Sequence, residues 1–331
     1  MVTVIRTPSF HKYLQWMLRW ALAFVVLLLA VHPLHATNPE KRHKIVLIAG
    51  SKSKGPGMHE YLKSARLLKV LLDRAGLKNV ETEVVYDGWP TNLSDLDTAD
   101  TIVFISDGMQ WSPWSFTPER IAAIQKQIDR GCGFMAFHFA TYIPYKFQKQ
   151  GLAWTGGYVE YDGPKHPQMY FTQKTLTTDV LFPNPKYPVM NGVKPFHVTD
   201  EFYYKATLVS GEAGITPLLR VPELPADPKV FPGPLAGAKD QVTMWAYCRP
   251  DSSGNKSYGR SIAATMGHFY NNWQNDDYRK LVLNAIVWTA HIEVPKDGVP
   301  STMISDAEVD EVLGPTPAPV PSPLEPAKEI K

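Results

Sequence analysis

The sequence has little cysteine, with two residues in 331, so a framework of several disulfides is excluded. Cys132 and Cys248 flank predicted strands. In an exported protein they could form one disulfide; the alternative, which we favour, is a pair of buried apolar thiols. Neither cysteine lies where a catalytic nucleophile is expected, and thiol chemistry is therefore not predicted.

Several motifs that bind nucleotides or metals are also missing. The chain has neither G-x-x-x-x-G-K-[ST] nor G-x-G-x-x-G, which excludes the P-loop and the dinucleotide-binding fingerprint. It also lacks H-E-x-x-H and Cys-x-x-Cys. Any metal site must therefore be assembled from side chains that lie far apart in the sequence.

A strong excess of either charge is absent too, because the formal net charge at pH 7 is only +2. Residues 1–36 carry three positive charges and no negative ones, and the chain without them has a net charge of −1. No basic patch remains that would indicate nucleic acid as a partner.

Residues 1–36 are typical of a secretory signal peptide. Basic residues precede an uncharged apolar run at 20–31, which leads to a cleavage site after Ala36. This run is shorter than the roughly 20 residues that a membrane span needs. We therefore predict a periplasmic or secreted protein, attached to a membrane only if the leader stays uncleaved.

Strand and helix patterns alternate along much of the remaining chain. Helices are expected at 61–75, from 118 to about 130, and at 276–290, and buried strands at 44–49, 80–86, 101–106, 133–138 and 261–266. This alternation predicts an α/β fold with a doubly wound, mostly parallel sheet of the flavodoxin-like type. Weaker patterns predict an antiparallel extension with strands at 157–161, 169–172, 202–208, 215–221 and 241–247.

These patterns divide the chain into four parts. The signal peptide is followed by a short linker at 37–43 and by one domain at 44–294. Residues 295–331, which end in a proline-rich stretch from 315, are expected to form a disordered tail.

Two of the buried strands end in the same dipeptide, His-Phe, at His138 and at His268. In open α/β sheets, ligands bind at the carboxyl ends of the strands. Imidazole is suited to proton transfer and to metal binding near neutral pH. One such histidine is usually a core residue, but two at equivalent strand ends favour a chemical site.

Loops that follow other strands supply further candidates. His59 and Glu60 lie in a glycine-rich loop, and their alternative role is to begin a helix. Asp107 precedes a glycine and could form a turn or orient a histidine. Residues 200–204 join a carboxylate pair to aromatic rings, which is typical of a sugar-handling surface or of an alternating surface strand. Residues 267–276 contain more amides and aromatic rings than a connection requires.

The chain from about 44 to 294 resembles the ThuA-like, or trehalose-utilisation, family. The resemblance is carried by residues 49–61, 86–89, 106–108, 138–140, 200–204 and 267–290, and the closest likeness is to exported bacterial members. It implies a class I glutamine amidotransferase-like fold and an association with sugar catabolism.

Comparison with true amidotransferases removes one reaction. Where they have a nucleophilic cysteine the chain has His138, and Tyr270 replaces the glutamate of their His-x-Glu pair. Glutaminase chemistry by a Cys–His pair is therefore not expected. Lys54 occupies a position at which family members often have histidine.

We therefore predict an exported carbohydrate-active enzyme that hydrolyses or isomerises keto-sugars or glycosides. A zinc-like divalent ion would be held by His59, His138 and His268. In the alternative ligand set, two of these histidines hold the ion together with Glu201. His138 and His268 are also candidate acid/base residues, and Glu201 or Asp107 would move the proton.

The predicted partner is a small carbohydrate. Its binding residues would be Glu60, Tyr204, Asn272 and Trp273. The alternatives are a non-catalytic sugar-binding module that uses the same crevice, and a surface scaffold protein.

Overall fold

The computed structural model describes residues 41–86, 88–108, 117–143, 147–160, 173–222, 240–251, 253–254 and 258–318. The predicted signal peptide, the strand expected at 169–172 and the end of the proline-rich tail lie outside these residues. Within the described ranges, no helix combines the length and the apolar character that a membrane crossing requires.

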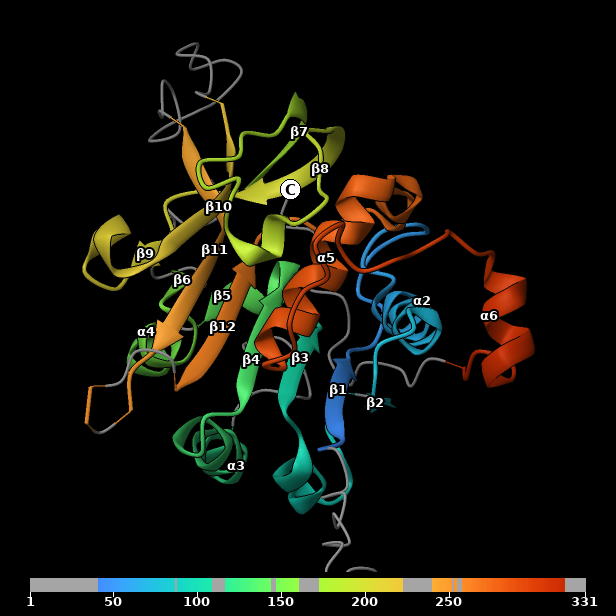
Figure 1. Ribbon diagram of the computed structural model, residues 1–331, viewed down its shortest axis with the longest axis horizontal. Coiled ribbons are helices and arrows are strands. Elements are labelled where there is room, and N and C mark those ends of the chain that lie inside the picture. The colour runs from blue at the N-terminus through green and yellow to red at the C-terminus, as the bar shows by residue number, and fades with distance from the viewer. Residues whose placement is uncertain are drawn as a thin grey trace, which may run out of the picture. The chain divides into compact units, whose positions relative to one another are not determined.

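A seven-stranded sheet organises the described chain in the order β10-β11-β12-β4-β3-β1-β2 (Figure 1). Five neighbouring strands run parallel: β12 (Gly259–Ala264), β4 (Gly133–Phe137), β3 (Thr101–Ile105), β1 (His43–Ala49) and β2 (Val80–Val85). The antiparallel strands β11 (Gln241–Arg249) and β10 (Thr216–Val221) extend one edge. The order of the parallel strands is that of flavodoxin-like sheets. The predicted doubly wound sheet with an antiparallel extension is confirmed.

Helices cover both faces of this sheet. On one face, the side to which Ile45 and Leu47 of β1 point, α2 (Tyr61–Arg74) packs against β1 and β2, and α5 (Asp276–Thr289) packs against β12, β4 and β3. On the other face α3 (Pro118–Asp129) and α4 (Gln148–Thr155) pack on the side to which Val46 and Ile48 point. Because both faces are covered, the central strands β3 and β4 are continuously apolar, whereas the edge strand β2 is not. The carboxyl ends of the parallel strands are left free to carry polar side chains.

Glycine at position 133 allows α5 to lie directly on the central strand β4 (Figure 1). A Cβ atom there would be 2.0 Å from the carbonyl oxygen of Thr289, the last residue of α5. The same contact includes a hydrogen bond of 2.9 Å from the hydroxyl of Thr101 to that of Thr289. The helix and the strand therefore approach each other more closely than any side chain at this position would permit.

Two smaller strand groups complete the described part of the domain. β7 (Gln173–Asp179), which the sequence did not reveal, pairs with β8 (His197–Tyr203). β5 (Tyr142–Ile143), β6 (Gly157–Glu160) and β9 (Thr207–Leu208) form a second small sheet. β8 begins five residues earlier than the strand predicted at 202–208, so the carboxylates at 200 and 201 lie inside the strand.

The prediction of disorder from residue 295 onward is wrong for 295–318. A capping box between Ser305 and Glu308 begins helix α6 (Asp306–Leu313), whose Val309 is buried. The buried guanidinium of Arg66 on α2 binds the carboxylate of Asp310 at 3.0 Å. Because the region is rich in proline, the sequence did not predict this short amphipathic helix, which packs against α2.

The two cysteines differ in their exposure, and no disulfide joins them. Cys132 is buried, as predicted, whereas Cys248 on β11 is exposed. Neighbouring side chains of a strand point to opposite sides, and at this end of β11 it is Arg249 that points inward. The prediction of a buried thiol is therefore wrong for Cys248.

Candidate metal centre

Three histidines and a glutamate meet at the carboxyl edge of the sheet. His59 lies in the loop after β1, His138 directly follows β4, and His268 lies in the turn after β12, while Glu201 comes from β8. His59 Nε2 lies 3.0 Å from both His138 Nε2 and His268 Nδ1, and the last two nitrogens are 3.3 Å apart. All four ligand atoms lie within 4.8 Å of one another.

The spacing of these atoms fits a tetrahedral metal site. Zn–N bonds of about 2.0–2.1 Å in a tetrahedron place ligand atoms about 3.3 Å apart. The three nitrogen–nitrogen distances are 3.0–3.3 Å, and Glu201 Oε2 lies 3.4 Å from His268 Nδ1 and 3.8 Å from His138 Nε2. The group could therefore hold a metal ion with three nitrogen ligands and one oxygen ligand.

The hydrogen bonds of His138 fix which of its nitrogens faces the centre as a lone pair. His138 Nδ1 lies 2.8 Å from the carbonyl oxygen of Thr265. A carbonyl oxygen only accepts, so Nδ1 carries the proton and donates it. Nε2 of the neutral ring is then an unprotonated acceptor, which is the form that binds a metal.

The same argument applies to His59 through two hydroxyl groups. Ser53 Oγ and Tyr61 OH each donate to Asp107 Oδ1 at 2.6 Å. The two hydroxyls also lie 2.8 and 2.7 Å from His59 Nδ1. Because their protons are already donated to Asp107, Nδ1 of His59 is the donor in these contacts. Its Nε2 is therefore also a lone pair directed at the centre, and Asp107 orients this ring.

Two lone pairs that face each other at 3.0 Å repel unless a cation or a proton lies between them. Without a metal, the hydroxyl of Tyr203 can supply a proton, since it lies 2.9 Å from His138 Nε2. Nδ1 of His268, when protonated, can likewise donate a hydrogen bond to His59 Nε2. The arrangement of ligand atoms thus favours a positive charge at its middle.

The backbone at two of the histidines is strained. His59 has φ of 48° and His138 has φ of 53°, both in the left-handed region that residues with a Cβ rarely adopt. A hydrogen bond of 3.0 Å from the N–H of His59 to the carbonyl oxygen of His268 holds the backbone of His59 in this conformation. Such strain persists where the surrounding structure overrides it, and it is concentrated at functional sites.

Burial keeps the imidazoles of His59 and His138 neutral. His59 and His138 are 2% and 0% exposed, and burial lowers the pKa of His59 and lowers that of His138 well below the usual value. For His138 the neighbouring His59 lowers the pKa further, with a smaller contribution from the charge of Lys54. Lys54 itself is exposed and does not belong to the cluster. Neutral imidazole is the form that metal binding requires.

The metal-free protein is expected to lose stability as the pH falls below 6.5, the usual imidazole pKa. In the unfolded chain His59 and His138 take up protons near this pH, whereas the buried rings stay neutral to lower pH. The unfolded state then binds more protons, so the free energy of unfolding decreases from pH 6.5 toward the lowered pKa. Denaturant unfolding at about pH 7.5 and about pH 5.5 measures this decrease. It should be smaller in His138→Asn, and an equal decrease in both proteins would contradict the assignment.

Two of the predicted sugar-binding residues, Tyr204 and Trp273, are buried in the core. Tyr204 is fully buried in the main apolar cluster. Trp273 is 2% exposed, stacks on Phe137 and donates from its indole nitrogen to Ser64 Oγ at 2.9 Å. Large aromatic rings next to a site are often core residues, because burying them contributes much of the packing energy. The prediction that these rings face a sugar is therefore wrong for this structure.

Of the remaining predicted site residues, Glu201 and Asp107 lie at the histidine cluster, whereas Asn272 and Glu60 lie outside it. Glu201 and Asp107 retain 15% and 12% side-chain exposure, so both are reachable from solvent. Asn272 is half-buried and donates to the carbonyl of Thr199 at 3.0 Å, outside the cluster. Glu60 pairs with Lys52 and lines a separate cavity of about 150 Å³ between the start of α2 and residues 316–317.

Sequence reasoning missed three residues that hold the ligands: Tyr61, Asp200 and Tyr203. Side chains at i and i+2 of a strand share a side, so Glu201 predicts Tyr203 rather than Tyr204 as its neighbour. The expected strand began at 202, and this signal was lost. For Tyr61, which begins α2, the sequence offers no such signal.

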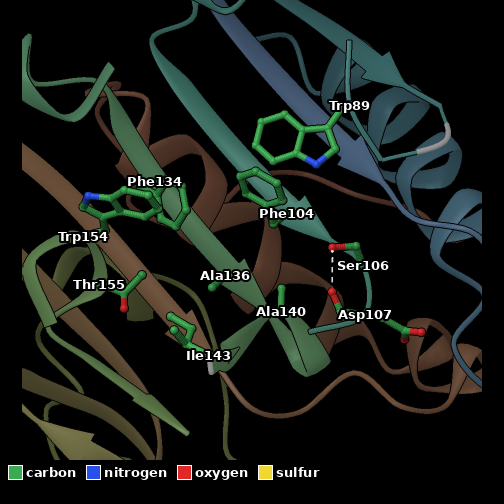
Figure 2. A pocket seen from close by; sticks show the side chains of 10 residues that line it. All are labelled: Trp89, Phe104, Ser106, Asp107, Phe134, Ala136, Ala140, Ile143, Trp154 and Thr155. Carbon is green, nitrogen blue, oxygen red and sulfur yellow. Dashed lines mark hydrogen bonds between the residues drawn. The ribbon is translucent and has the colours of Figure 1, made fainter. Parts of the chain in front are cut away.

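A second concavity near Asp107 is apolar and belongs to the core. Figure 2 shows the rings of Trp89, Phe104, Phe134 and Trp154 around it, with the carboxylate of Asp107 turned away. Its free space of about 20 Å³ corresponds to roughly one water molecule. A sugar ring does not fit there, so the candidate chemistry lies at the histidine cluster.

Comparisons with known proteins agree with this fold. No match was found among curated proteins. Two crystal structures described as ThuA-like proteins superpose with low identity: one from Bacteroides uniformis (17% identity, TM-score 0.52, 75% of this chain and 91% of that chain) and one from Parabacteroides merdae (16% identity, TM-score 0.51, 78% and 95%). A family model described as ThuA, trehalose utilisation, matches residues 46–289. The chain therefore belongs to the ThuA family.

Proposed function

We propose that this chain is an exported carbohydrate-active enzyme with a zinc-type divalent ion at its centre. The observation that carries the proposal is the convergence of three imidazole nitrogens, from His59, His138 and His268, at 3.0–3.3 Å. The hydrogen bonds that leave lone pairs directed at one point support it further. Three protein ligands that leave the fourth position open are typical of catalytic zinc sites.

The proposed substrate is a sugar, in agreement with the description of the family as trehalose utilisation. The proposed reaction is hydrolysis or isomerisation of a keto-sugar or glycoside. A bound divalent ion supplies Lewis-acid polarisation of a sugar oxygen. Glu201 is the partly exposed carboxylate of the cluster, and it moves the proton at a sugar hydroxyl. Asp107 holds His59 through Ser53 and Tyr61 and does not itself move the proton.

Burial of the two phenols supports their role as donors. Burial raises the pKa of Tyr61 and of Tyr203 well above the usual value, so both hydroxyls stay protonated at neutral pH. Tyr203 stacks on His138, and its hydroxyl lies on the side of the ring that faces the centre. In the metal-free protein this hydroxyl therefore holds the His138 ring through Nε2, the atom that a bound ion would occupy instead. The leader at 1–36 exports the protein to the periplasm or beyond.

Metal analysis of the purified protein tests the proposal, together with a screen of mono- and disaccharides and their 3-keto forms by thermal shift. We expect about one divalent ion per chain, as a single site of this type requires. Sugars that raise the melting temperature are then tested for turnover by product analysis. Stabilisation without turnover would indicate the sugar-binding module instead. A parent protein that takes up no metal, even when metal is supplied, would contradict the metal centre.

A further inference from the structure

A buried carboxylate behind the metal ligands joins two of the segments that carry them. Asp200 on β8 is fully buried, and its side chain accepts four hydrogen bonds. Oδ1 accepts the backbone N–H groups of Glu201 and His268, both at 2.9 Å. Oδ2 accepts the N–H of Gly267 at 2.8 Å and the hydroxyl of Tyr278 on α5 at 3.5 Å. The donors are all neutral, and three of them are backbone groups next to or within predicted ligands.

The turn that carries His268 depends on these bonds for its place. Gly267 has φ of 125°, and a Cβ atom there would be 2.5 Å from the ring of Phe137 and 3.0 Å from the Cβ of His138. The turn thus passes directly against the end of β4 and has left the strand ladder of β12, which ends at Ala264. Its buried N–H groups need an acceptor from elsewhere. Asp200 supplies that acceptor.

Both carboxylate oxygens act on the geometry of the centre. Oδ1 of Asp200 binds the backbone N–H groups of both Glu201 and His268, and Oδ2 binds that of Gly267. Together they hold the turn that places His268 Nδ1 at 3.4 Å from Glu201 Oε2. The carbonyl of His268 in turn accepts the N–H of His59 at 3.0 Å. Three ligands are therefore linked to one side chain that does not itself face the centre.

We propose that Asp200 is the positioning residue of the metal centre, setting the distance between His268 and Glu201 by holding both backbones. This inference rests on the proposed function for its metal and on the apoprotein geometry for its contacts. An asparagine at this position keeps the shape but replaces one accepting oxygen by an NH₂ group, which faces N–H donors. The turn then moves away from β8, and the ligand set opens.

The test compares Zn²⁺ and Co²⁺ binding by the full-length protein and by Asp200→Asn. We expect the affinity for Zn²⁺, measured in competition with a chromophoric chelator, to fall about 10–100-fold, the usual effect of removing a residue that orients metal ligands. The visible absorption of bound Co²⁺ should change as its coordination changes. Asp200→Ser, which can still accept one bond, is expected to act in the same direction and replaces the asparagine variant if that one does not fold.

A matched control separates position from general stability. Asn284 is also fully buried, and its amide holds the backbone of residues 189, 191 and 299 far from the centre. Asn284→Ala should lower the melting temperature and leave the Zn²⁺ affinity and the Co²⁺ spectrum unchanged. Unchanged affinity in Asp200→Asn, or an equal loss in Asn284→Ala, would overturn the inference.

A metal-independent measurement keeps this inference distinct from the proposed function. In the metal-free proteins, ¹H–¹⁵N spectra of the histidine side chains report the hydrogen bonds of each ring. We expect the His268 signals to shift in Asp200→Asn and to stay in place in Asn284→Ala. If the parent binds no metal but this shift occurs, the proposed function fails while the positioning role of Asp200 stands. If the shift is missing, the positioning role fails.

Discussion

Replacing His138 with asparagine is expected to lower the affinity for Zn²⁺ by at least about 100-fold, the upper end of what loss of an orienting neighbour costs. The imidazole of His138 is fully buried, and its Nε2 is 3.0 Å from His59 and 3.3 Å from His268. Removing it takes one of the three nitrogen ligands from the centre. Asparagine is chosen because it tolerates the left-handed backbone that this position requires, where alanine would add strain.

Competition with a chromophoric chelator measures this loss, and denaturant unfolding of the metal-free variant shows that the fold is retained. His197→Asn is the matched control, since His197 is exposed and contacts Asp179 where β7 ends and β8 begins. This control should bind Zn²⁺ like the parent. If His138→Asn retained parental affinity while folded, the three histidines would not form a metal centre.

Replacing Gly133 with alanine is expected to lower the free energy of unfolding by about 3 kcal/mol, the upper part of the range for overpacked cores. The new methyl group would overlap the carbonyl oxygen of Thr289, at 2.0 Å, and the hydroxyl of Thr101, at 2.8 Å. Both neighbours are fixed, one as the end of α5 and the other as part of β3. The helix must move away from the central strand to admit the methyl group.

Urea unfolding monitored by tryptophan fluorescence measures this change. Gly55→Ala is a suitable control, because a Cβ atom there meets only the end of the flexible Met58 side chain, at 3.1 Å. We expect this control to lose less than about 0.5 kcal/mol, as surface substitutions usually do. A Gly133→Ala protein as stable as the control would show that α5 does not lie on β4 as closely as described.

The parallel sheet could be predicted from the sequence because its central strands are buried on both faces and form continuous apolar runs. For the same reason His138 and His268 were visible as polar residues at the ends of such runs. Glu201 was also recognised, but the face to which it points was not. The predicted strand began at 202 and therefore left out Glu201. Without Glu201 in the strand, its alternation could not show that Tyr203, and not Tyr204, lies on the same side as Glu201.

Other parts of the site depend on contacts that no local pattern contains. Trp273 was expected to face a sugar, because an aromatic ring in a loop after a strand has the same letters whether it packs inward or outward. Asp200 acquires its role from the N–H groups of a turn 67 and 68 residues further along the chain. Helix α6 was missed because prolines lie both before and after the segment that its capping box begins. For Trp273 and Asp200 the deciding partner is distant in sequence, whereas the capping box of α6 is a local signal.

The separation of the ligands along the chain has a consequence for the order of folding. His59 and His138 are 79 residues apart, and His138 and His268 are 130 residues apart. No early fragment of the chain can present all three nitrogens, so an ion cannot begin folding in the way that it does in a zinc finger. The proposed ion would bind only after β1, β4 and β12 have joined one sheet. Metal uptake during refolding is therefore expected to be the last step, and its rate reports completion of the sheet.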